Sequence, residues 1–142
     1  MEIKNILVVC VGNICRSPTA EFLLKKNHPD LHIESAGLSA MVGHAADDKA
    51  IACMDALNID MRTHIAKQIN ADLIKRSDLI LVMSSNQQKH IEQKWPFAKG
   101  KVFRLGHWQS QNVPDPYQLD QAFFEQTCKN IAAYVADWQS HI

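Results

Sequence analysis

Short apolar runs alternate along the chain with longer segments in which apolar residues recur every three or four positions. The runs are Lys4–Val9, Leu31–Ser35, Asp78–Met83 and Lys101–Leu105. Runs of this length that are rich in Val, Ile and Leu are typical of strands buried on both faces of a sheet. We therefore predict four strands in these segments.

Helical spacing of apolar residues marks three further segments. The first helix is expected to begin at Ser17, with this residue as its cap and Pro18 at its first position, and to end before Pro29. A second helix is predicted over Ala46–Leu57 and a last one over Leu119–Trp138.

Strands that alternate with helices predict an α/β fold, in which helices cover both faces of a four-stranded parallel sheet. The length of 142 residues suits one domain, and no repeat or Gly/Ser/Pro-rich linker divides the sequence. We therefore assign residues 1–142 to a single three-layer domain. Ligands of such sheets bind beyond the carboxyl ends of the strands, so the loop after the first strand is the first candidate site.

Composition narrows the class of function. Fifteen basic and fifteen acidic side chains give a formal net charge of zero, whereas nucleic-acid binding usually needs a basic surplus. The apolar runs are far shorter than a membrane span, and a basic leader is absent from the first residues. We expect a cytoplasmic protein with reduced cysteines that binds neither nucleic acid nor membranes.

The loop after the first strand combines residue types that bind an oxyanion. It runs from Cys10 to Ser17 and contains Gly12, Asn13 and Arg16. Gly12 permits a close backbone approach or a positive φ, and Asn13 tolerates a left-handed backbone. Backbone N–H groups, a helix start and the Arg16 guanidinium all favour a bound anion. A thiol at Cys10 is therefore expected to ionise and act as a nucleophile.

The segment Val9–Pro18 resembles the phosphate-binding loop of the low molecular weight protein tyrosine phosphatases, and the similarity covers nearly the whole chain. Gly106–Trp108 and Pro114–Tyr117 resemble the bacterial branch that acts with capsule and exopolysaccharide tyrosine kinases. The resemblance implies hydrolysis of a phosphotyrosine protein, such as that kinase, through a phosphocysteine intermediate and with no metal or other cofactor. It implies that phosphate is bound by the loop residues Val11, Gly12, Asn13, Ile14, Cys15, Arg16 and Ser17.

Release of a phenolate or alkoxide requires a proton donor on another loop at the same edge of the sheet. Asp115 follows the last predicted strand and lies between Pro114 and Pro116, which stiffen its loop. An Asp-Pro pair alone is typical of a turn. Together with the Cys10 loop and the resemblance, it indicates that Asp115 is the general acid.

Four residues are expected to complete the site. The resemblance maps Ser35 and His64 onto positions that hydrogen-bond Asn13 and hold the loop in shape. Tyr117 is expected to form one aromatic wall of the substrate site, and Met41 is the apolar candidate for the opposite wall. Without the resemblance, His64 would be interpreted as a surface or otherwise satisfied histidine, and Tyr117 would fit a partly buried turn residue equally well.

Two other functions fit parts of this pattern. Arsenate reductases share the loop and the fold, but they need two further redox cysteines near the site, and Cys53 and Cys128 lie on apolar helical stripes. A non-catalytic phosphopeptide-binding module is expected to lose its nucleophile or its acid, and this chain has both. We therefore favour the phosphatase.

The sequence leaves two questions open. Cys15 either forms a reversible disulfide with Cys10, which would protect the nucleophile from over-oxidation, or simply packs inward. The second question is the oligomeric state, for which we expect a monomer or a weak dimer. Four aromatic residues belong either to the core or to a contact patch between copies: Trp95, Phe97, Phe103 and Trp108.

Overall fold

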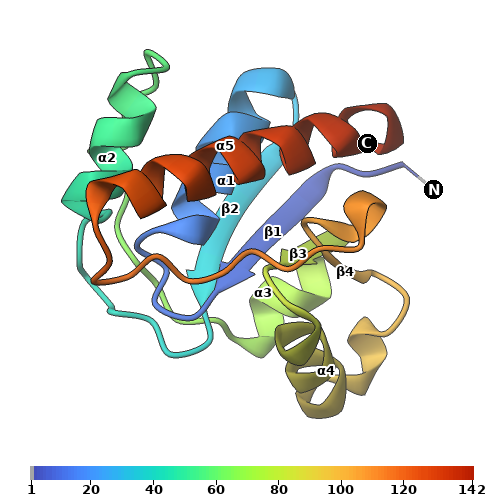
Figure 1. Ribbon diagram of the computed structural model, residues 1–142. Coiled ribbons are helices and arrows are strands. Elements are labelled where there is room, and N and C mark those ends of the chain that lie inside the picture. The colour runs from blue at the N-terminus through green and yellow to red at the C-terminus, as the bar shows by residue number, and fades with distance from the viewer. Residues whose placement is uncertain (1) are drawn as a thin grey trace.

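The computed structural model describes residues 2–142, and within them the sheet has four parallel strands (Figure 1). β1 (Asn5–Cys10) pairs with β2 (His32–Gly37) on one side and with β3 (Leu79–Val82) on the other, and β4 (Val102–Arg104) extends the sheet beyond β3. The predicted parallel sheet is confirmed, and each strand lies within two residues of its expected ends.

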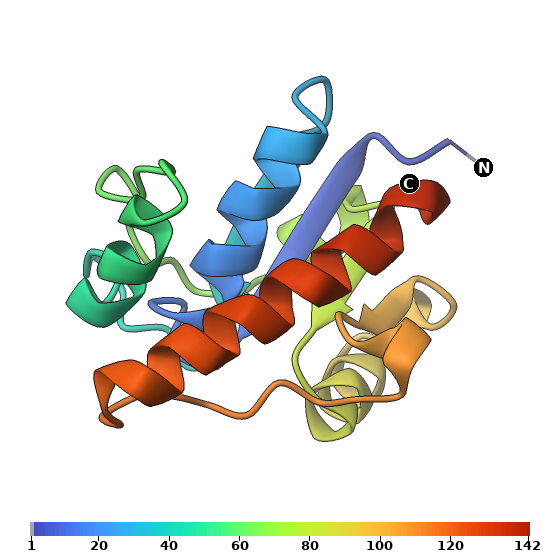
Figure 2. The same cartoon turned by 45° about the horizontal axis from the view of Figure 1, so that its top comes forward.

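The helices form layers on both sides of the sheet (Figure 2). α1 and α5 cover one face, α3 and α4 cover the other, and α2 packs against α5. Among the described residues, none of the helices is both long and apolar enough to span a bilayer. The helices are α1 (Arg16–Asn27), α2 (Asp48–Asp55), α3 (Ala71–Arg76), α4 (Ser85–Lys94) and α5 (Gln121–Trp138), with short 3₁₀ helices at Pro96–Ala98, His107–Gln109 and Gln139–His141.

β1 explains why the first apolar run is continuous. Successive side chains of a strand point to opposite faces of the sheet. Ile6, Val8 and Cys10 pack in the core under α1 and α5, whereas Leu7 and Val9 pack in the core under α3 and α4. All five side chains are almost fully buried. The strand therefore contributes side chains to the cores on both faces of the sheet, and it ends with Cys10 at the carboxyl edge.

The start of α1 differs from the prediction. The helix begins at Arg16, two residues before the predicted first position at Pro18, and Cys15 occupies the cap position, so the prediction of Ser17 as the cap is wrong. Ser17 lies in the first turn, where its hydroxyl meets Cys10. Pro18 is consequently the third helical residue, a position whose N–H needs no intrahelical partner.

Aspartate caps shorten two other predicted helices. Asp47 and Asp120 each accept a hydrogen bond from a backbone N–H in the first turn, so α2 begins at Asp48 and α5 begins after Asp120. α2 also ends earlier than expected, and Leu57 lies beyond it and is exposed. At the starts of both helices, capping by an aspartate side chain thus outweighed the apolar spacing.

The apolar pattern did not predict α3 and α4. α3 has six residues and α4 is mostly polar, with Gln87 and Ile91 as its buried side chains, so neither carries a wide apolar stripe. Their starts are set by Asn70 and Ser84, each of which accepts a backbone hydrogen bond from the first turn. Capping and the neighbouring sheet fix these helices instead of amphipathic spacing.

The aromatic residues of the second half divide between core and surface. Phe103 packs edge-on against Trp138, and Trp95 is half-buried against the core under α4. Phe97 and Trp108 are exposed. The oligomeric state stays a prediction.

Candidate active site

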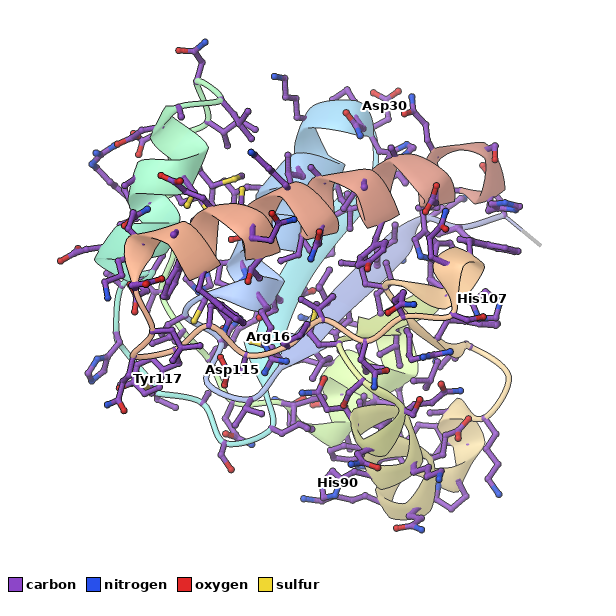
Figure 3. The ribbon with its side chains drawn as sticks, in the orientation of Figure 1. Arg16, Asp30, His90, His107, Asp115 and Tyr117 are labelled. Carbon is purple, nitrogen blue, oxygen red and sulfur yellow. The ribbon has the colours of Figure 1, made fainter. Side chains whose placement is uncertain are left out.

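The predicted site residues meet at the carboxyl edge of the sheet. Cys10 ends β1, and the loop after it leads into α1, while the segment after β4 brings Asp115 back across this edge. Figure 3 shows Asp115 close to Arg16, with Tyr117 near them on the same segment. Between them lies a pocket of about 210 Å³ lined by Cys10, Val11, Gly12, Ile14, Cys15, Arg16, Ser39, Met41, Asp115 and Tyr117.

Cys10 lines this pocket and is almost fully buried. Its Sγ is 2.9 Å from the hydroxyl oxygen of Ser17 and accepts a hydrogen bond from the backbone N–H of Asn13 at 3.3 Å. Hydrogen-bond donors around a sulfur stabilise its anionic form relative to the neutral thiol. The loop is therefore built to hold negative charge at this atom.

Asn13 organises the loop from within. Its backbone has a φ of 60°, the left-handed conformation that asparagine tolerates. Its side chain is fully buried and donates from Nδ2 to the hydroxyls of Ser17 at 2.8 Å and Ser35 at 2.9 Å. The amide oxygen accepts from the backbone N–H of Lys67 at 2.9 Å. The left-handed residue of the loop is thus Asn13 and not Gly12.

Ser35 and His64 both reach Asn13, as the resemblance implied. Ser35 belongs to β2 and accepts a hydrogen bond from the Asn13 side chain, whereas the His64 ring is hydrogen-bonded to the backbone carbonyl of Asn13. His64 Nε2 lies 2.7 Å from the carbonyl oxygen, which can only accept, so this nitrogen carries the proton. Both residues are buried, and they hold the loop from two sides.

Two substitutions separate the backbone requirement of Asn13 from its side-chain contacts. Asn13→Gly and Asn13→Ala both remove the amide, but only glycine adopts a φ near +60° at little cost. We expect Asn13→Gly to be more stable than Asn13→Ala by about 1 kcal/mol. Urea unfolding of the two variants measures this difference, and an alanine variant as stable as the glycine variant would contradict the interpretation.

Arg16 links the phosphate-binding loop to the segment that carries Asp115. Its side chain is 5% exposed, and Nη1 donates to the carbonyl oxygen of Val113 at 2.9 Å. Nη2 lies 3.6 Å from Oδ2 of Asp115, whose side chain is 47% exposed. The other carboxylate oxygen accepts from the backbone N–H of Tyr117 at 3.0 Å. A buried cation and a solvent-accessible carboxylate therefore share the pocket.

The rim of the pocket is apolar. Tyr117 and Val11 are each 41% exposed, and Met41 lines the same pocket, so both predicted wall residues are present. The backbone N–H of Met41 donates to the carbonyl oxygen of Gly12 at 3.0 Å, which ties the wall to the loop. Ser39, two residues before Met41, also lines the pocket, and the sequence did not single it out.

The other three cysteines are buried: Cys15 lines the pocket, whereas Cys53 and Cys128 lie outside it in the core between α2 and α5. Burial raises the pKa of Cys15 to about 12, and the nearby Cys10 and Asp115 add to this effect. Burial likewise raises the pKa of Cys128 to about 11 and that of Cys53 in the same direction. Cys15 therefore packs inward as a neutral thiol in this state, and its disulfide with Cys10 stays a prediction.

Comparisons with known sequences agree with this site geometry. Residues 5–142 match the family described as low molecular weight phosphotyrosine protein phosphatase. The low molecular weight protein-tyrosine-phosphatase Ptp of Acinetobacter johnsonii is 67% identical over 142 residues, which cover 100% of both chains.

Solved structures show the same relationship. The crystal structure of the Erwinia amylovora tyrosine phosphatase AmsI has a TM-score of 0.96 and 39% identity, over 99% of this chain and 94% of that one. Vibrio vulnificus Wzb, in complex with benzylphosphonate, has a TM-score of 0.95 and 35% identity, over 99% and 100% of the two chains.

Proposed function

The chain belongs to the low molecular weight phosphotyrosine protein phosphatases, and from this premise we propose that it hydrolyses phosphotyrosine through a phosphocysteine intermediate on Cys10. One observation carries the proposal. The Cys10 sulfur contacts the Ser17 hydroxyl and the Asn13 N–H, and Cys10 lines the same pocket as Arg16 and Asp115. A nucleophile, an anion-binding group and an acid are thus within reach of one bound phosphate.

In the first step the Cys10 thiolate attacks phosphorus, and a sulfur–phosphorus bond forms as the bond to the tyrosine oxygen breaks. Backbone N–H groups of the loop and the Arg16 guanidinium hold the phosphoryl oxygens. Asp115, as the carboxylic acid, gives its proton to the departing phenolate. The products of this step are tyrosine and the phosphoenzyme.

In the second step a water molecule attacks the phosphocysteine. The Asp115 carboxylate removes a proton from this water, and the sulfur–phosphorus bond breaks to release inorganic phosphate and the Cys10 thiolate. The Ser17 hydroxyl, 2.9 Å from the sulfur, stabilises the departing thiolate. The enzyme then returns to its initial protonation state.

The natural substrate we propose is the phosphorylated tyrosine kinase of capsule or exopolysaccharide export. The resemblance to that branch and the similarity to AmsI and Wzb support this assignment. Vibrio vulnificus Wzb binds benzylphosphonate, an aromatic phosphate mimic. In the present chain, the half-exposed Tyr117 lines the pocket of Cys10 and offers a surface for such a ring. We further infer that the reaction takes place in the cytoplasm.

The two alternative functions find less support. The two cysteines that an arsenate reductase would use, Cys53 and Cys128, are buried in the core between α2 and α5, and burial raises the pKa of both. A non-catalytic module does not require an acid beside the nucleophile, yet Asp115 lines the pocket that contains Cys10.

Paired peptides test the proposed reaction. A phosphotyrosine peptide and a phosphoserine peptide of the same flanking sequence are incubated with the enzyme in the presence of EDTA. We expect phosphate release from the first and little from the second, because the shorter side chain does not bring its phosphate to the buried Cys10. Hydrolysis that EDTA abolishes, or equal hydrolysis of both peptides, would argue against the proposal.

Substrate trapping tests the proposed partner. Asp115→Ala is expected to retain phosphoproteins from a lysate of the host, because it binds phosphate but releases the leaving group slowly. The expected captured protein is a tyrosine-phosphorylated kinase, identified by mass spectrometry. Capture of other phosphotyrosine proteins without this kinase would refute the assignment of the substrate.

A further inference from the structure

A chain of buried hydrogen bonds leads from Cys10 to Glu21, a residue of α1 that the proposed mechanism does not use. One hydrogen of the Asn13 amide goes to Ser17, which contacts Cys10, and the other goes to Ser35. The Ser35 hydroxyl oxygen lies 2.5 Å from Oε1 of Glu21. The four residues of this hydrogen-bond network beyond Cys10 are at most 6% exposed; they are Ser17, Asn13, Ser35 and Glu21. Solvent therefore has little part in these contacts.

The carboxylate at the far end sets the direction of the first bonds. The Glu21 carboxylate also accepts from Nζ of Lys25 at 2.6 Å, and a carboxylate can only accept. Ser35 must therefore donate its single hydrogen to Glu21 and accept from Asn13. The backbone N–H of Lys67 donates to the amide oxygen of Asn13 and thereby turns the amide nitrogen toward the serines.

The same logic fixes the bond at the nucleophile. The Ser17 oxygen accepts from Asn13, and the Cys10 thiolate of the proposed mechanism can only accept, so the single hydrogen of Ser17 points to the sulfur. The sulfur then receives two hydrogen bonds, from the Ser17 hydroxyl and from the Asn13 N–H, as a thiolate requires. With the Cys10 thiolate and the Glu21 carboxylate as the two terminal acceptors, each hydrogen from Asn13 Nδ2 and from the two serine hydroxyls has an acceptor.

We propose that Glu21 is a positioning residue for the nucleophile. By fixing the hydroxyl of Ser35 it holds the Asn13 amide, and this keeps the Ser17 hydrogen directed at Cys10. The inference rests on the proposed role of Cys10, and it adds a residue of α1 whose side chain lies outside the pocket.

Glu21→Gln is an informative change because it keeps the shape of the side chain. The ammonium of Lys25 attracts the remaining carbonyl oxygen, so the new amide group faces Ser35. The Ser35 oxygen then meets donors from position 21 and from Asn13, and its own hydrogen loses its acceptor. The orientation of the chain is weakened although its residues stay in place.

The experiment compares wild type with Glu21→Gln, Ser35→Ala and the double variant. Two properties are measured: kcat and KM for p-nitrophenyl phosphate, and the pH profile of Cys10 alkylation by iodoacetate. Each single variant is expected to lose about fivefold in kcat, the effect of one hydrogen bond, with KM little changed. The midpoint of alkylation is expected to move to higher pH in both. Because Glu21 acts through Ser35, the double variant is expected to be no slower than Ser35→Ala.

Glu125→Gln is the matched control, since it makes the same change on the exposed surface of α5. It should leave kcat and the alkylation profile unchanged. Single-variant losses that multiply in the double variant would overturn the proposal, as would a lower melting temperature with an unmoved alkylation profile.

The proposed function is judged separately, by whether alkylation of Cys10 in the wild type abolishes turnover. If turnover survives complete alkylation, the catalytic role of Cys10 is wrong, whatever Glu21 does to the reactivity of the sulfur.

Discussion

Cys10→Ser is expected to lower kcat for aryl phosphates by about 10⁴-fold or more, while phosphate binding is kept. A serine hydroxyl is a weak nucleophile unless a base removes its proton, and the contacts of the Cys10 sulfur are donors: the Ser17 hydroxyl and the Asn13 N–H. The phosphate-binding groups, the loop N–H groups and the Arg16 guanidinium, are untouched by the substitution.

The measurement combines steady-state kinetics on p-nitrophenyl phosphate with calorimetric titration of inorganic phosphate. Cys53→Ser is the matched control, because it makes the same change at a buried thiol of α2. It should fold and retain its turnover within about twofold, as expected for a residue that does not act as a unit with the catalytic group. A Cys10→Ser variant with near wild-type kcat would refute the nucleophilic role.

Asp115→Asn is expected to produce the second-largest effect, and its size should depend on the leaving group. Loss of a general acid lowers the rate by about 10²–10⁴-fold when the leaving group needs a proton. Phenyl phosphate, which releases a basic phenolate, should approach the upper limit. p-Nitrophenyl phosphate should lose less, because its phenolate departs with less assistance.

The ratio of the two substrates is the diagnostic quantity. Asp30→Asn serves as the control, since Asp30 lies at the opposite edge of the sheet from Asp115 (Figure 3). Equal losses on both substrates in Asp115→Asn would mean that the carboxylate positions the substrate or the Arg16 side chain, 3.6 Å away, and does not protonate the leaving group.

The two central strands, β1 and β3, could be predicted because they are nearly continuous apolar runs. Each residue of β1 from Ile6 onward is buried on one face or the other, so the sequence has no polar position to obscure the strand. α3 and α4 escaped prediction for the opposite reason. They are short or polar, and their positions depend on caps such as Asn70 and on contacts with the finished sheet.

The candidate site divides in the same way. The loop from Cys10 to Arg16 is local in sequence, so its residue types alone indicated an anion site. The 3.6 Å approach of Arg16 to Asp115 depends on the segment after β4 crossing the sheet edge. The position of Asp115 after the last predicted strand indicated this edge, but its choice as the acid also needed the resemblance. Glu21 had no sequence signal, because its contact with Ser35 exists only when α1 packs beside β2.

The central claim is that the phosphoryl group passes through the sulfur of Cys10. Asp115→Asn should let this species accumulate, because a good leaving group departs without the acid while hydrolysis of the phosphoenzyme lacks its base. Rapid quenching of this variant during turnover of p-nitrophenyl phosphate, followed by fragmentation mass spectrometry, locates the group. We expect a phosphoryl group on the Cys10 sulfur and none on Cys15. A phosphoryl group on any other side chain, or an unmodified Cys10 during saturated turnover, would contradict the account.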